Sequence, residues 1–174
     1  MKKSLLISFL LFSINLYADM GIVEKVVDGD TIKFTDKTSC RFANIDTPES
    51  MSNARLLKKI SFCNKHFFVS EKKMKDSGVL SKEYLKTLIS VGDSLEYSII
   101  SKDRYGRVIC EVFKNNDSIN FMMVKKGYAV PYNNYIKDSK IKQKYNLANL
   151  QAKTKKEGIY AFDEATMECL KITN

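Results

Sequence analysis

The sequence predicts an α+β fold in which a small, closed barrel of five short strands carries three helices. Three observations predict this arrangement. Five short segments rich in β-branched and aromatic residues are separated by turn-forming sequences. One segment with helical spacing of its apolar residues lies before the fourth strand, and two more follow the fifth. The length of 174 residues is that of one domain and is sufficient to bury a core.

The first three strands are predicted at Gly21–Val27, Thr31–Thr35 and Cys40–Ile45. An Asp-Gly pair separates the first two strands and an Asp-Lys-Thr triplet the next two, and both are turn-forming sequences. Alternation along the third strand places Cys40 on one face and Arg41 on the other. A proline shortly after this strand cannot donate to a ladder, so the chain must leave the sheet there.

The remaining strands and the three helices follow in the second half of the chain. The strands are predicted at Leu95–Ser101 and Val108–Phe113, with a helix at Gly78–Ser90 before them. A short helix at Ile119–Lys126 and a last helix at Asp138–Glu157 are each stopped by a glycine. Small barrels of five strands include the oligonucleotide/oligosaccharide-binding (OB) barrel, so the predicted barrel is OB-fold-like.

The charge and the histidine and cysteine counts narrow the classes of function. Lys and Arg number 29 against 20 Asp and Glu, which gives a formal net charge of +9. Such an excess attracts polyanions, of which nucleic acid and anionic membrane surfaces are the leading candidates. His66 is the only histidine, which excludes a Ser-His-Asp triad or a two-histidine metal site within one chain. The four cysteines do not have zinc-site spacing.

The first eighteen residues have the layout of a secretory signal peptide. Lys2 and Lys3 give a positive start, residues 5–16 carry no charge, and Ala18 is a small residue before a polar chain. The apolar run is short for a membrane-spanning helix, and an uncleaved membrane anchor is the alternative. We expect cleavage after Ala18, a single domain at residues 19–174 without a stable membrane span, and a secreted or periplasmic protein.

Residues 51–76 are rich in lysine and have no clear period. We interpret them as a surface insertion with one or two helical turns. Its lysines form either a solvated face or an extension of a binding groove. The four cysteines all lie after the predicted signal peptide. An even number of cysteines in an exported protein indicates disulfides, and four cysteines allow three pairings.

Three short segments carry the residues best suited to chemistry. They are residues 28–31 (Asp-Gly-Asp-Thr), Arg41 followed by residues 46–49 (Asp-Thr-Pro-Glu), and residues 103–107 (Asp-Arg-Tyr-Gly-Arg). Each alone has a structural explanation as a turn, a helix start or a solvated loop. Together, in this order and with these spacings, they resemble the thermonuclease (staphylococcal nuclease-like) family. The resemblance covers nearly the whole chain after the signal peptide, and the insertion matches least.

This resemblance implies a five-stranded barrel with three helices that acts as a calcium-dependent phosphodiesterase. Asp30 and Asp46 match the carboxylate ligands of the ion, and Thr47 matches the residue that contributes a main-chain carbonyl. Asp28 is expected beside this ligand set rather than in it. Calcium prefers several hard oxygen ligands, so two carboxylates predict a weak site that water and a substrate phosphate complete.

The catalytic groups implied by the resemblance are Arg41, Glu49 and Arg107. The planar forks of the two arginines offer paired donors to the oxygens of a phosphate as it becomes five-coordinate. Glu49 matches the carboxylate assigned as general base, which takes a proton from the attacking water.

Three further residues are candidates for substrate binding. Arg104 and Tyr105 are expected to hold a neighbouring phosphate or base. Tyr132 belongs to a tyrosine-rich run at the place where family members present aromatic residues to the substrate. We expect Tyr132 to stack on a base, with packing in the core as the alternative.

The resemblance also indicates which cysteines could pair. If Arg41 and Arg107 face one site, alternation places Cys40 and Cys110 in the barrel core, on strands that are neighbours in the family fold. A disulfide between Cys40 and Cys110 is therefore geometrically possible, which leaves Cys63 to pair with Cys169, and the latter bond is the one we favour. Free, buried thiols at the first two positions are the alternative, because core cysteines often act as small apolar residues.

The expected function is that of an exported, monomeric, calcium-dependent endonuclease acting on DNA, RNA or both. The resemblance implies little sequence specificity and products that end in a 3′-phosphate. One alternative is an OB-fold protein of the cell envelope that binds nucleic acid without cutting it, although the acidic and arginine residues of the motifs are all retained. A second is an envelope protein that binds anionic lipid or polysaccharide through its charge.

Overall fold

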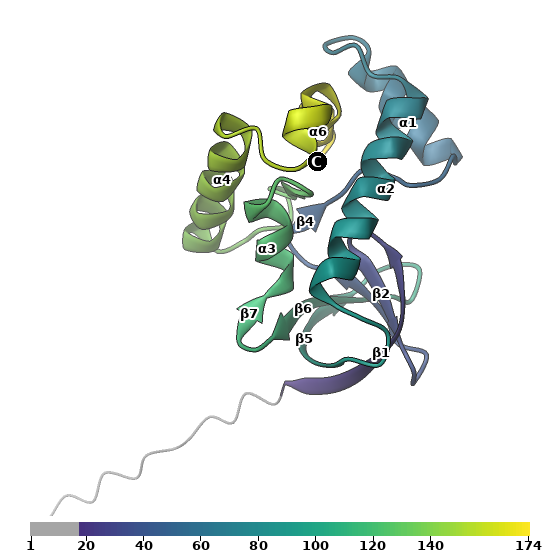
Figure 1. Cartoon of the computed structure of the whole chain (residues 1–174), viewed down its shortest axis with the longest axis vertical. Coiled ribbons are helices and arrows are strands. Elements are labelled where there is room, and N and C mark those ends of the chain that lie inside the picture. The colour runs from purple at the N-terminus through teal and green to yellow at the C-terminus, as the bar shows by residue number, and fades with distance from the viewer. Residues whose placement is uncertain (1–17) are drawn as a thin grey trace, which may run out of the picture.

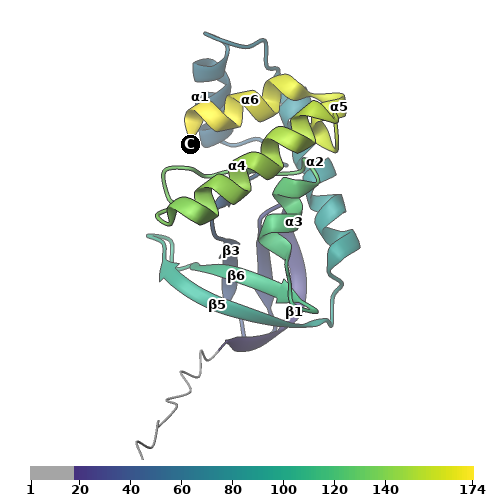
Figure 2. The same ribbon diagram turned by 90° about the vertical axis from the view of Figure 1, so that its left-hand side faces the viewer.

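The computed structural model describes residues 18–174, so the predicted signal peptide, except for Ala18, lies outside the described residues. The barrel strands gather at one end of the molecule and most of the helices at the other (Figure 1, Figure 2). No helix of the described part is long and apolar enough to cross a membrane. The strands are β1 (Asp19–Asp28), β2 (Thr31–Phe34), β3 (Ser39–Phe42), β4 (Ile45–Asp46), β5 (Ser94–Lys102), β6 (Val108–Lys114), β7 (Asp117–Ser118) and β8 (Val130–Pro131). The helices are α1 (Ala54–Cys63), α2 (Glu71–Leu88), α3 (Ile119–Lys125), α4 (Ser139–Thr154), α5 (Ile159–Phe162) and α6 (Glu164–Thr173).

Five strands close into a barrel. Their order in the sheet is β3-β2-β1-β5-β6, and a parallel pairing between β3 and β6 joins the two ends of the sheet. Arg41 of β3 pairs with Thr31 of β2 on one side and with Ile109 of β6 on the other. The predicted α+β fold with an OB-like barrel is confirmed, and the seam of the barrel passes through the strand that carries Arg41.

The third predicted strand is interrupted shortly before Asp46. β3 ends at Phe42, and Asn44 adopts a left-handed conformation with φ of 67°, which asparagine tolerates better than most residues. After this turn Asp46 pairs with Val130 of β8 rather than with the barrel. The interruption therefore carries Asp46 away from the barrel wall while it stays near Arg41.

The barrel interior and the helices α2, α3 and α4 share one apolar core. Phe34 of β2 stacks on Tyr97 of β5, with ring centroids 4.7 Å apart. The predicted inward alternation of β2 is confirmed, because Ile32 and Phe34 are both fully buried. Further fully buried members are Val23, Leu95, Val112 and Met123.

The three predicted helices correspond to α2, α3 and α4, and α1, α5 and α6 come in addition. α2 begins at Glu71, well before the start predicted at Gly78. The side chain of Ser70 caps this helix by accepting from the Lys73 N–H. Gly78 lies inside this helix, and glycine is required there because a Cβ would clash with the backbone of Glu49. The glycine that looked like a helix boundary is thus a close-packing residue.

The insertion contains more helix than the one or two turns expected. α1 begins after Asn53, whose side chain accepts from the Leu56 N–H. The buried face of α1 forms a second, smaller core together with α2 and α6, and α6 lies against α1 (Figure 2). The buried members of this second core are Leu56, Cys63, Val69, Met74 and Cys169.

Both expected disulfides are present. Cys40 of β3 and Cys110 of β6 are linked across the parallel seam of the barrel, with Cα atoms 5.9 Å apart. Cys63, the last residue of α1, is linked to Cys169 of α6, with Cα atoms 5.3 Å apart. The first bond fixes the strand of Arg41 to β6, and the second fixes the insertion to the C-terminal helix.

Replacing Cys63 and Cys169 together with alanine is expected to lower the free energy of unfolding by about 3 kcal/mol, because cross-linking a long loop restricts the unfolded chain. The two residues are separated by 106 positions in the sequence. Chemical denaturation of the double variant and the wild type checks the value. A non-reducing peptide map that links Cys63 to Cys40 or Cys110 would contradict the pairing.

Candidate active site

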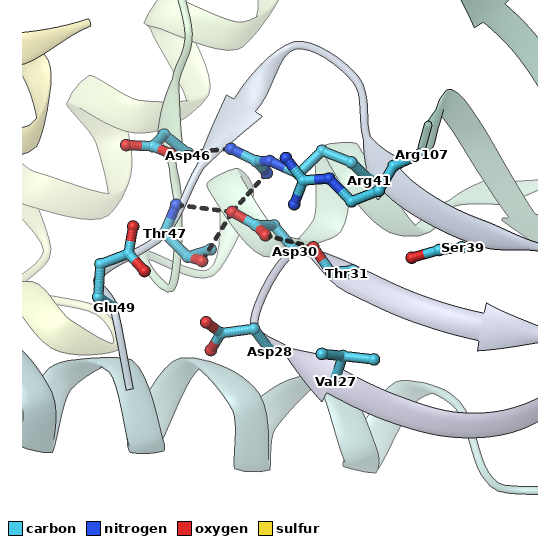
Figure 3. A pocket seen from close by; sticks show the side chains of 10 residues that line it. All are labelled: Val27, Asp28, Asp30, Thr31, Ser39, Arg41, Asp46, Thr47, Glu49 and Arg107. Atoms are coloured by element: carbon cyan, nitrogen blue, oxygen red, sulfur yellow. Dashed lines mark hydrogen bonds and ion pairs between the residues drawn. The ribbon is translucent and has the colours of Figure 1, made fainter. Parts of the chain in front are cut away.

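A polar pocket of about 200 Å³ lies where the three motif segments meet at the rim of the barrel (Figure 3). Its walls come from the end of β1, the turn into β2, the start of β3, the residues around β4, and the residue before β6. Segments far apart in the sequence therefore contribute to one site. The lining residues are Val27, Asp28, Asp30, Thr31, Ser39, Arg41, Asp46, Thr47, Glu49 and Arg107.

The guanidinium of Arg41 lies at the centre of this pocket. Arg41 is buried, with 8% of its surface exposed. One of its terminal nitrogens contacts the carboxylate of Asp30, and the other lies 2.8 Å from Oδ1 of Asp46. Burial opposes the charge of the guanidinium, but the two carboxylates outweigh this effect and hold the pKa of Arg41 above its ordinary value. Two charged partners orient the fork in one direction.

Asp30 connects the turn after β1 to the segment after β4. Its Oδ2 accepts from the Thr47 N–H at 3.2 Å and from the Thr47 hydroxyl at 2.9 Å. Its Oδ1 accepts from the Thr31 hydroxyl at 3.0 Å, and its main-chain carbonyl accepts from the Phe42 N–H at 2.8 Å. The first two motif segments are therefore one hydrogen-bonded unit.

Asp28 adds negative charge beside this unit. Burial, and then the negative charge of Asp30, raise the pKa of Asp28 to about 6, while the Gly29 N–H donates to its Oδ1 at 2.9 Å and opposes the rise. The raised pKa reflects mainly the burial of this carboxylate, with repulsion from Asp30 as the second cause. A cation bound there would offset this repulsion.

Arg107 enters the pocket from the loop between β5 and β6. Asp103 holds it, because Oδ2 of Asp103 lies 2.8 Å from both Nε and one terminal nitrogen of Arg107. Burial of the Asp103 carboxylate opposes its ionisation, but the hydrogen bonds from Arg107 and Tyr105 outweigh this and lower the pKa of Asp103. Gly106 has a φ of 81°, which lets the loop turn tightly between its acidic and basic ends.

Glu49 lies on the opposite side of the pocket, where its carboxylate faces the same space as that of Asp28 (Figure 3). The side-chain amide of Asn53 donates to Glu49 at 3.4 Å. The backbone of Glu49 rests on Gly78 of α2, where a Cβ would clash with it. Helix α2 therefore helps to fix the position of the Glu49 segment.

Lys59 of α1 also reaches this site, and the sequence reasoning missed it. Its ammonium lies 2.7 Å from Oδ2 of Asp46, and only 9% of the residue is exposed. A helical signal was present, because Leu56, Lys59 and Cys63 recur at spacings of three and four residues. The many exposed lysines around them concealed it.

The structure brings together most of the predicted site residues. Asp30, Arg41, Asp46, Thr47, Glu49 and Arg107 all line the pocket, as does Asp28. Three predicted substrate-binding residues do not. The Arg104 guanidinium donates to the Tyr105 hydroxyl at 2.8 Å, and both side chains are exposed beside Arg107. Tyr132 lines a separate hollow next to Lys59.

The pocket combines hard oxygen donors with guanidinium groups. Asp30 and Asp46 contact the same guanidinium, so their carboxylates converge on one place. Oxygen donors of this kind suit calcium, and an ion at Asp46 would compete with the Lys59 ammonium. Between residues 18 and 174, no group of three or more histidines, cysteines or carboxylates has the arrangement of a metal site. Water and substrate would have to complete the coordination of any ion bound at these two carboxylates.

Known proteins resemble this chain over most of its length. The staphylococcal nuclease homologue family matches residues 39–161. Endonuclease YhcR of Bacillus subtilis is 32% identical in an alignment of 156 residues that covers 85% of this chain and 12% of that protein. The uncharacterized protein MJ1439 of Methanocaldococcus jannaschii is 29% identical in an alignment of 163 residues that covers 80% of this chain and 70% of that protein. Endonuclease YncB of Bacillus subtilis is 27% identical in an alignment of 146 residues that covers 80% of this chain and 60% of that protein. The chain thus spans a small part of the first of these relatives.

Replacing Lys59 with methionine keeps most of the side-chain volume but removes a charged partner of Asp46. We expect a loss of about 2 kcal/mol in the free energy of unfolding, because breaking a buried ion pair leaves a carboxylate less well compensated. Lys58→Met is the matched control, since Lys58 is exposed on the same helix and should change stability by less than about 0.5 kcal/mol. Equal effects in chemical denaturation would contradict a role for the Lys59–Asp46 contact.

Proposed function

The chain belongs to the staphylococcal nuclease homologue family, and we propose that it is an exported, calcium-dependent endonuclease that hydrolyses phosphodiester bonds of DNA, RNA or both. The observation that carries this proposal is the convergence of Arg41 and Arg107 with four carboxylates in one pocket. The names of two relatives from Bacillus subtilis, both endonucleases, support it.

The two arginines are proposed to hold the phosphate that is cleaved. Arg41 is fixed by Asp30 and Asp46, and Arg107 by Asp103, so both forks are oriented before the substrate arrives. Donors held in place stabilise the charge that builds on the phosphate oxygens without reorganising during the reaction. Asp103 acts here as a positioning residue for Arg107.

Glu49 is proposed to accept a proton from the attacking water. As the water oxygen bonds to phosphorus, the bond from phosphorus to the 5′ oxygen of the leaving nucleotide breaks, and that oxygen takes a proton from solvent. This direction of cleavage leaves a 3′-phosphate on the other product. Glu49 lines the pocket together with both arginines, which suits a base acting on a water next to the phosphate.

Calcium is proposed to bind Asp30, Asp46 and the main-chain carbonyl of Thr47, where its charge would offset that of the phosphate. The hydrogen bonds between Thr47 and Asp30 keep these donors together. Asp28, which lines the same pocket, would stabilise the ion from just outside the ligand set.

Export is proposed on the predicted signal peptide, and the two disulfides support it. Disulfides form and persist mainly in oxidising compartments such as the periplasm or the extracellular space. All four cysteines are paired in the described structure.

The proposed function is tested by incubating the protein, without residues 1–18, with labelled DNA and RNA in calcium or in excess chelator. Cleavage in calcium alone is the expected result. Binding without cleavage under both conditions would favour a non-catalytic protein instead.

Replacing Arg107 with lysine keeps the charge but removes the planar fork. We expect kcat to fall by about 100-fold, as when one oriented transition-state donor is lost, while the affinity for nucleic acid changes little because many basic groups share it. Arg104→Lys is the matched control on the same loop. Arg104 lies outside the pocket and contacts Tyr105 in solvent, so this change should leave kcat near the wild-type value. A wild-type kcat for Arg107→Lys would remove this loop from the catalytic machinery.

A further inference from the structure

A second hollow lies between the insertion and the C-terminal helix. It measures about 410 Å³, which is larger than the pocket around Arg41. One wall belongs to α1 and the other to α6, which lie side by side (Figure 2). We call it the α1–α6 groove. Its lining residues are Lys58, Lys59, Phe62, Tyr132, Ile172 and Thr173.

The α1–α6 groove adjoins the candidate active site. Lys59 lines the groove, and its ammonium lies 2.7 Å from Asp46, which lines the pocket around Arg41. Tyr132 lines the groove from the loop after β8, and its N–H donates to the Asn44 carbonyl in the turn that leads to Asp46. A polymer bound in the pocket would therefore enter this groove on the Asp46 side.

The groove combines basic and apolar side chains. Phe62 and Ile172 are 44% and 43% exposed and lie together in the groove. Lys58 lies on the same exposed face, and Lys65 lies 6.0 Å from the Phe62 ring. Single-stranded nucleic acid is bound by such a combination, in which bases stack on aromatic rings and ammonium groups track the phosphates.

The two walls are held at a fixed separation. The disulfide between Cys63 and Cys169 joins α1 to α6 next to Phe62, and the Thr173 hydroxyl donates to the Cys169 carbonyl at 3.0 Å. A preformed groove avoids the cost of ordering its walls when it binds a ligand. Ile172 and Thr173 lie beyond residues 39–161, the segment that matches the family, so the α6 wall of the groove lies outside that segment, whereas the α1 wall lies within it.

We propose that the α1–α6 groove binds the nucleotides next to the cleaved bond of a single-stranded substrate, with a base stacked on Phe62 and a phosphate near Lys58. This inference rests on the proposed nuclease function. It extends the bound substrate from the nucleotide at the cleaved bond to a strand of several nucleotides, because the strand reaches the groove only where it continues past Asp46. Unpaired bases are required, since a base within a duplex is already stacked.

The test compares the double variant Lys58→Ala/Phe62→Ala with the wild type. Binding of fluorescent single-stranded oligonucleotides of three and eight nucleotides is measured by anisotropy in excess chelator, so no cleavage is needed. The variant is expected to bind the longer strand about 10-fold more weakly and to lose about one unit of salt dependence, while the shorter strand is unaffected. The control variant Phe68→Ala/Lys140→Ala removes one exposed aromatic residue and one exposed lysine outside both hollows and should bind both strands as the wild type does.

Three outcomes would overturn the groove proposal. The first is unchanged binding of the long strand by the double variant, and the second is an equal weakening in the control variant. The third is a double variant that no longer binds phosphatidylglycerol vesicles but binds oligonucleotides as the wild type does, which would make the groove a lipid site. If the wild type cuts neither DNA nor RNA, the proposed function fails. A length-dependent loss of binding in the double variant would still support the groove.

Discussion

A buried guanidinium needs carboxylate partners, and this requirement organises the rest of the site. Arg41 lies on β3 at the seam where the barrel closes against β6. Taking such a charge out of water costs several kcal/mol unless it is paired and hydrogen-bonded. Asp30 and Asp46 meet this need, and in doing so they tie the turn after β1 and the short strand β4 to the barrel. The carboxylates that compensate Arg41 are also those proposed to hold calcium, so folding assembles the donors before any ion binds.

Close packing of α2 gives the site its second constraint. A Cβ at Gly29 would clash with Ser81 of α2, and a Cβ at Gly78 would clash with the backbone of Glu49. The helix therefore lies flush against both the acidic turn and the segment of the proposed base. The Ser81 hydroxyl also donates to the Tyr128 carbonyl at 2.7 Å, which joins α2 to the chain that leads into β8. The spacing of the catalytic groups thus depends on small residues whose own side chains take no part in the chemistry.

Much of the barrel was predictable from local signals in the sequence, and most of the pocket from the resemblance of its three motif segments, taken together, to one family. Alternation along β3 placed Cys40 in the core and Arg41 on the other face, and the motif around Asp46 placed its carboxylate within a few residues of that strand. The insertion was not predictable in this way. Lys59 reaches Asp46 only because α1 packs on α6, a long-range contact that has no local period. The start of α2 was predicted too late, at Gly78, for a related reason. This glycine leaves room for the backbone of another segment, which is a long-range contact.

The carboxylates assembled around Arg41 are proposed to hold the ion on which cleavage depends. The most direct test of this proposal is the rate of DNA or RNA cleavage against calcium concentration for the wild type and for Asp30→Asn. Because the change makes a charged ligand neutral, we predict that the half-maximal calcium concentration rises by about 10-fold or more. An unchanged half-maximal concentration, or cleavage by the wild type in excess chelator, would contradict it.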